Sequence, residues 1–111
     1  MAVTNWRDAV LTILSGATAS EEVDLAAKGA RRAKSLMIRG PATLAVTITV
    51  HVAEVVGGTY YPLSIGGSDF TIPAAKWVVL PLDMPIGALK LIAGSAVGED
   101  EVFRIMGVAV R

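Results

Sequence analysis

The amino-acid sequence predicts an all-β fold, a β-sandwich or jelly roll of about seven to eight strands. Aliphatic and β-branched runs alternate with turn residues at roughly ten-residue intervals, a spacing typical of these architectures. Residues 42–52 alternate between apolar and mainly polar positions without a break, as a half-buried strand does. The length of 111 residues fits one domain, and no linker divides the chain.

We expect residues 1–17 to form an N-terminal arm and residues 18–111 to form the sandwich domain. The apolar residues from Trp6 to Leu14 fit a helical stripe, but part of this run would also make a short strand. Gly16 ends the run. An arm ahead of a sandwich often stays loose unless another element holds it.

Residues 18–39 fit two different structures, a helix or a pair of strands. Thr18 to Glu21 matches a capping box, and the alanine spacing that follows favours a helix with a basic face. The alternative is two strands, near Glu21–Leu25 and Lys34–Arg39, joined by a loop around Gly29. Helix propensity favours the first, and the family resemblance given below favours the strands. We give the strands more weight, and leave the choice open for residues 20–37.

The stretch from Ala42 to Val52 is expected to be the central strand. Its eleven residues would span roughly 36 Å at about 3.3 Å each. Thr47, Thr49 and His51 lie on the polar face, and the aliphatic face must pack on a second layer. The residues expected to be buried together are Leu44, Val46, Ile48, Val50 and Val52 with Phe70, Ile72, Val79 and Leu91.

Turn residues divide the second half of the chain into further strands. Gly57-Gly58 and Gly66-Gly67 suit tight turns because glycine accepts a positive φ. The apolar run from Trp77 to Leu82 predicts a strand covered on both faces, with Trp77 in the core. The other expected strands are 60–65, a short one at 70–72, 88–93 and 102–110.

The composition argues against several classes of function. Ten basic residues balance ten acidic ones, so no overall field attracts nucleic acid or a membrane, and we expect neither as a partner. The chain has no cysteine and therefore no disulfide or thiolate metal site. Hydrophobic residues make up 53% of the chain although only 5% are aromatic, which suggests apolar surface reserved for neighbouring molecules.

No catalytic pattern is present in the sequence. His51 is the only histidine, and no motif supplies the partners that a triad or a histidine-based metal site needs. The acidic run 99–101 lacks a calcium-loop pattern and is expected to be a solvated turn. The paired glycines do not match a phosphate-binding loop. We therefore expect no enzymatic activity, no metal and no cofactor.

The candidate site residues are partner contacts. Half of the basic residues fall within twelve positions, and no aromatic residue is interleaved for base stacking. We therefore favour an acidic protein surface over nucleic acid, with a solvated face as the alternative. Tryptophan is enriched at interface hot spots, so Trp6 of the arm is included among the candidate contacts. The residues proposed to contact a partner are Trp6, Arg7, Lys28, Arg31, Arg32, Lys34 and Arg39.

Six short motifs follow one another along residues 12–110. They are Thr12–Thr18 (Thr-Ile-Leu-Ser-Gly-Ala-Thr), Val23–Leu25 (Val-Asp-Leu), Leu36–Pro41 (Leu-Met-Ile-Arg-Gly-Pro), Gly57–Tyr61 (Gly-Gly-Thr-Tyr-Tyr), Phe70–Ala74 (Phe-Thr-Ile-Pro-Ala) and Leu89–Ala96 (Leu-Lys-Leu-Ile-Ala-Gly-Ser-Ala). In this order they resemble a family of small virion proteins of tailed bacteriophages. Each motif is short and common by itself, and the resemblance is specific because the motifs occur in this order.

The resemblance implies a jelly-roll-like β-sandwich, and more narrowly a capsid decoration (cement or staple) protein of short-tailed bacteriophages. Such a protein is not an enzyme. It is made in the host cytoplasm, lies on the outer surface of the virion's capsid, clamps neighbouring major capsid protein subunits and pairs as a homodimer. The basic stretch Ala26–Lys34 departs from the family pattern. The alternative is a carbohydrate-binding or structural β-sandwich of a phage tail or spike, for which Tyr60 and Tyr61 are the available aromatics.

Overall fold

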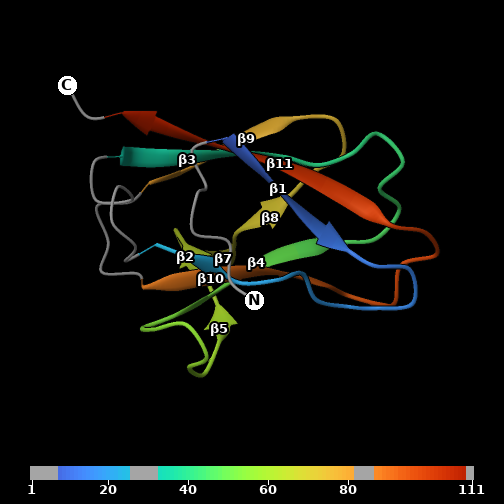
Figure 1. Ribbon diagram of the computed structural model, residues 1–111, viewed down its shortest axis with the longest axis horizontal. Coiled ribbons are helices and arrows are strands. Elements are labelled where there is room, and N and C mark those ends of the chain that lie inside the picture. The colour runs from blue at the N-terminus through green and yellow to red at the C-terminus, as the bar shows by residue number, and fades with distance from the viewer. Residues whose placement is uncertain (1–7, 26–32, 82–86, 110–111) are drawn as a thin grey trace.

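Two antiparallel sheets pack face to face in a computed structural model that describes residues 8–25, 33–81 and 87–109 (Figure 1). The upper sheet in that view has four strands, in the order β1 (Asp8–Ile13), β11 (Glu101–Ala109), β3 (Ala33–Arg39) and β9 (Trp77–Pro81). The lower sheet has the order β2 (Val23–Asp24), β10 (Ala88–Ala93), β4 (Ile48–Ala53) and β5 (Tyr61–Pro62), and β8 (Thr71–Ile72) also pairs with β4. A separate small hairpin joins β6 (Ser64–Ile65) to β7 (Ser68–Asp69).

The order of strands is that of a jelly roll. From β1 to β4, consecutive strands alternate between the two sheets, and β9, β10 and β11 alternate again. Each long strand therefore pairs with a neighbour distant in the sequence, as in two interleaved Greek keys. The all-β sandwich expected from the sequence is confirmed, and no helix occurs in the described ranges.

One apolar core fills the space between the sheets. Alternate residues of each strand point inward because the side-chain period of a strand is two. Burying each such aliphatic or aromatic side chain stabilises the fold by about 1.5–3 kcal/mol. The larger of the fully buried side chains are Leu11, Ile13, Leu36, Ile38, Leu80, Phe103 and Ile105 from the upper sheet and Val23, Ile48, Val50, Leu89 and Leu91 from the lower one.

The central strand is shorter than expected, although its faces are as predicted. Only Ile48–Ala53 form β4; the residues before it are an irregular crossing from the other sheet. The ladder between β4 and β10 ends at the pair Ile48 and Ala93, after which the chain of β10 turns at Gly94. The last backbone bond on this side is from Gly94 N–H to Thr47 O at 2.9 Å. The residues before Thr47 do not continue the strand, but Leu44 and Val46 still pack against the core.

The strand β9 contradicts the expectation that both of its faces are covered. Val78 packs against the core and Leu80 is buried, whereas Val79 is 54% exposed and Trp77 is 39% exposed. The predictions that Val79 and Trp77 are core residues are therefore wrong. β9 lies at the edge of the upper sheet, and no described element covers the outer face of that sheet.

The two ambiguous segments both contain strands. Residues 23–24 and 33–39 form β2 and β3, as the strand interpretation predicted, while residues 26–32 lie outside the described ranges. In the expected arm, residues 8–13 form β1, which pairs with β11 and contributes Leu11 and Ile13 to the core. At least these residues of the arm therefore belong to the sandwich.

Candidate functional site

The predicted partner contacts lie mostly outside the described residues. This holds for Trp6, Arg7, Lys28, Arg31 and Arg32, so their contribution stays a prediction. Lys34 lies in β3, and the structure does not describe its side chain. Arg39, at the end of β3, is exposed, and its guanidinium lies 5.4 Å from the centroid of the Trp77 ring.

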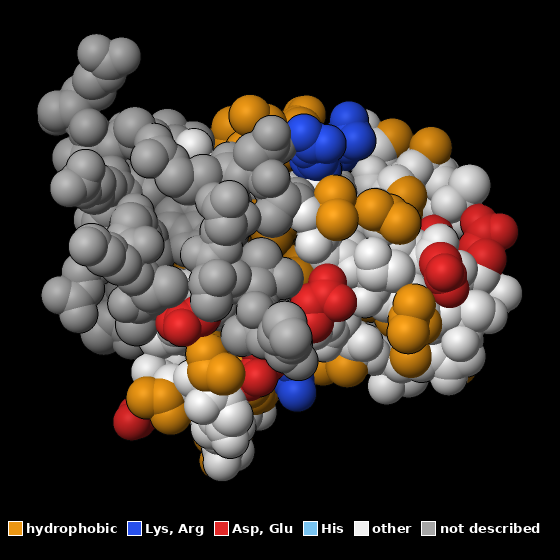
Figure 2. Space-filling model, in the orientation of Figure 1, with side chains coloured by type: hydrophobic (Ala, Val, Ile, Leu, Met, Phe, Trp, Pro, Cys, Tyr) orange, Lys and Arg blue, Asp and Glu red, His pale blue; other side chains and the backbone are white. Residues whose placement is uncertain are grey.

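The outer face of the upper sheet has an apolar surface around Arg39. We call it the outer sheet face and define it by Val10, Trp77, Val79, Val102 and Met106. Each of these side chains is between 39% and 54% exposed. They come from β1, β9 and β11, and β3 lies between β9 and β11. Figure 2 shows hydrophobic side chains along this upper edge, next to basic ones.

This face can bind a partner with an apolar surface. Monomeric proteins rarely expose large contiguous apolar patches without a role in binding. The stacking of the Arg39 guanidinium on Trp77 restricts both side chains. Across the sheet Arg39 also pairs with Arg104, which pairs with Val10, so two cations lie among the apolar side chains of this face. Tryptophan and arginine are the residue types enriched at interface hot spots. Arg39 is thus the one predicted contact residue that the described structure places beside an apolar surface.

A second cluster ties down the hairpin between β4 and β5. The N–H of Gly57 and the hydroxyl of Tyr60 both donate to Glu22 Oε1, at 2.6 Å and 2.5 Å. The Lys90 ammonium lies 4.4 Å from the centroid of the Tyr60 ring. The hydrogen bond from Tyr60, followed by that from Gly57, holds the pKa of Glu22 below its ordinary 4.5. Burial and the nearby Glu22 carboxylate raise the pKa of Tyr60.

The Glu22 contacts should make the stability of the fold depend on pH in the acid range. The pKa of Glu22 is lower in the folded state, so its stabilising effect is present above about pH 4.5 and is lost as the pH falls through the folded pKa. Replacing Glu22 with glutamine removes the titrating group. We expect the difference in urea midpoint between the native chain and Glu22→Gln to shrink from about pH 6 to about pH 3.

A matched control for this experiment is Glu99→Gln, because Glu99 is exposed in the turn before β11. Its urea midpoint should follow that of the native chain across the same range. If the difference in urea midpoint between the native chain and Glu22→Gln stays constant with pH, the carboxylate charge does not stabilise the hairpin.

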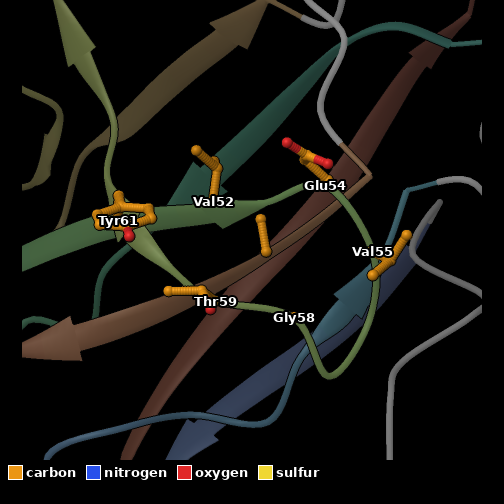
Figure 3. Close-up of a pocket in the computed structure, with 7 residues that line it drawn as sticks. Val52, Glu54, Val55, Gly58, Thr59 and Tyr61 are labelled. Atoms are coloured by element: carbon orange, nitrogen blue, oxygen red, sulfur yellow. The ribbon is translucent and has the colours of Figure 1, made fainter.

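A pocket of about 420 Å³ opens beside the same hairpin (Figure 3). In that view Tyr61 and Thr59 lie on one side and Glu54 and Val55 on the other. Tyr61 is paired with Val52 in the ladder between β5 and β4, and its side chain is 67% exposed. The residues that line the pocket are Val52, Ala53, Glu54, Val55, Gly58, Thr59 and Tyr61.

His51 and the acidic run 99–101 lie in different parts of the fold. His51 pairs with Lys90 in the ladder between β4 and β10, and the acidic run leads into β11. Burial, and then the nearby Lys90 charge, lowers the pKa of His51, and Asp69 opposes this shift. Of the acidic run, Glu99 and Asp100 are exposed, whereas Glu101 is buried and accepts a hydrogen bond from Thr43 at 3.0 Å. The solvated-turn prediction is thus wrong for Glu101.

Within the described ranges, no three histidine, cysteine, aspartate or glutamate side chains are placed to hold a metal ion. No helix there is long and apolar enough to cross a membrane. Comparison with known proteins finds no matching family model, no similar curated protein and no similar solved structure.

Sequence reasoning missed the hairpin cluster and the outer sheet face. Glu22 is 35 residues before Gly57 and 38 before Tyr60, and no local pattern links positions so far apart. The outer sheet face could have been suspected from the alternation of Val102 and Met106 with Phe103 and Ile105, which shows apolar residues on both faces of one strand. Such a strand requires either two covering layers or an apolar surface for a partner.

Proposed function

We propose that this chain is a non-enzymatic virion protein that decorates the outside of a phage capsid and clamps neighbouring major capsid protein subunits. The observation that supports this proposal most directly is the outer sheet face, an apolar surface next to the Arg39–Trp77 stack. A sandwich with such a face has one side suited to a protein partner. The motif order along residues 12–110 supplies the phage context.

In this proposal the sandwich and the N-terminal segment make separate contacts with the shell. The outer sheet face would lie on one capsid subunit, and Trp6 would be an anchor on a neighbouring subunit. A second linked contact raises the total affinity without any change in the first. The basic residues Arg31, Arg32 and Lys34 would face acidic capsid surface, where exposed ion pairs add only about 0.2–1 kcal/mol each.

The proposal is tested by substitution on the outer sheet face. Trp77→Ala removes the largest side chain of the face and the ring on which Arg39 stacks. A hot-spot truncation costs about 2 kcal/mol or more, so we expect the affinity for purified heads to fall by at least about 30-fold. Occupancy on heads of the phage that encodes the chain, measured by quantitative mass spectrometry after washing, reports this loss.

The matched control is Ile65→Ala, because Ile65 is an exposed apolar residue on the β6–β7 hairpin and not on the outer sheet face. It should keep full occupancy. Equal occupancy of Trp77→Ala and Ile65→Ala would contradict docking through this face, and absence of the native chain from purified heads would contradict the function itself. Copies on the shell that are never paired would contradict the proposed homodimer.

A further inference from the structure

The hairpin pocket has a lining that suits one particular kind of ligand. Its walls are largely aliphatic, from Val52, Ala53 and Val55, and its volume of about 420 Å³ lies in the range of small-ligand sites. Among the described lining residues, only Glu54 is charged. Its carboxylate accepts no hydrogen bond and forms no ion pair with the rest of the described chain.

Tyr61 provides a second group that attracts positive charge. Its ring is largely exposed and lies across the pocket from Glu54 in Figure 3. The negative face of an aromatic ring attracts a cation, and arginine and lysine are the side chains that use this interaction. A carboxylate and an exposed ring on opposite sides therefore both favour a cationic group between them.

The pocket is held in shape before any ligand binds. The backbone of the hairpin is fixed by the bond from Gly58 N–H to Val55 O, at 3.1 Å, and by the Glu22 contacts to Gly57 and Tyr60. Because the loop is already ordered, binding does not carry the entropic cost of closing it. The exposed Tyr61 side chain therefore lies on a rigid support.

We propose that this pocket binds an arginine or lysine side chain of a protein partner, with Glu54 contacting the cationic head and the aliphatic walls contacting its methylene stem. Long basic side chains have this division between an apolar stem and a charged end. A saccharide presents hydroxyl groups around its ring and needs several polar partners. Beyond Glu54, the only polar side-chain groups that the described lining offers it are the hydroxyls of Thr59 and Tyr61. The site is independent of the outer sheet face, so the inference does not rest on the proposed function.

The test uses two small probes of nearly equal shape, n-butylguanidinium and the uncharged n-butylurea. Titration into the full chain, followed by backbone amide chemical shifts, should give saturable changes at residues 52–61 with the guanidinium probe and none with the urea. Glu54→Gln should weaken binding of n-butylguanidinium by about tenfold, since a charge-assisted hydrogen bond is lost. Tyr61→Ala should weaken it as well, and Glu99→Gln should leave it unchanged.

Several results would overturn the proposal. Equal responses to the charged and uncharged probes would show apolar binding without recognition of the cation. Unchanged affinity in Glu54→Gln would remove the carboxylate from the site, and shifts that never saturate would show that no site exists. Saturable shifts with methyl glycosides, together with no response to n-butylguanidinium, would assign the pocket to saccharides. None of these outcomes depends on whether the chain occupies a capsid.

Discussion

Replacing Phe103 with alanine is expected to lower the free energy of unfolding by about 3–5 kcal/mol. Phe103 is fully buried near the start of β11, where it pairs with Leu11 of β1. Removing its ring would leave a cavity between the sheets, because the backbone of a paired strand cannot move inward to fill it. For a chain of this size, total stability is about 5–15 kcal/mol, so the loss is a large fraction of it. Urea unfolding followed by circular dichroism measures the change.

The control is Val102→Ala, one position earlier on the same strand. Val102 points to the outer sheet face and is 47% exposed, so its truncation leaves no internal cavity. We expect it to cost less than about 1 kcal/mol. Similar losses for Phe103→Ala and Val102→Ala would contradict the assignment of the two faces of β11.

The second large loss of stability is expected when Gly87 is replaced with alanine. A Cβ placed there would lie 1.6 Å from the carbonyl oxygen of Glu54 and 2.4 Å from its carbonyl carbon. Gly87 also donates to Ala53 O at 3.0 Å and accepts from Leu25 N–H at 2.9 Å, so it cannot move away without loss of both bonds. Overpacking of this kind typically costs about 1–3 kcal/mol, and breaking the two bonds adds to it. We expect Gly87→Ala to destabilise the fold by about 3 kcal/mol in urea unfolding.

Gly94→Ala is the matched control, at the opposite end of β10. Its added Cβ would lie 3.7 Å from Thr47 O, which is an ordinary van der Waals distance. The substitution should leave stability within about 1 kcal/mol of the native chain or raise it slightly. If Gly87→Ala were as stable as Gly94→Ala, the close approach between Gly87 and the Glu54 backbone would not exist in solution.

The two proposed binding regions differ in the interaction that dominates each. The outer sheet face offers apolar area with Arg39 and Arg104 among its apolar side chains. The hairpin pocket offers a carboxylate and an aromatic ring, through Glu54 and Tyr61. Added salt should therefore weaken binding at the pocket more than binding at the outer sheet face, since ionic contacts near the surface are screened.

Some of the candidate site could be expected from the sequence, and some could not. The exposure of Tyr61 follows from its place after a glycine hairpin, where a strand begins at the edge of a sheet. The engagement of Tyr60 by Glu22 and Lys90 could not be inferred, because these residues come from three separate strands or connections. Contacts between distant segments depend on the register of the strands, which alternation by itself does not specify.

The sequence by itself determined the class of fold and which face of the central strand β4 turns inward. Period-two alternation placed Ile48 and Val50 in the core, because apolar faces must be removed from water. The tertiary structure alone decided where strands end and which apolar residues stay exposed. Ile48 begins β4 because the ladder with β10 stops there, and Val79 is exposed because β9 lies at an edge with no described layer above it. Both outcomes depend on neighbours supplied by distant segments, and a local pattern contains no information about them.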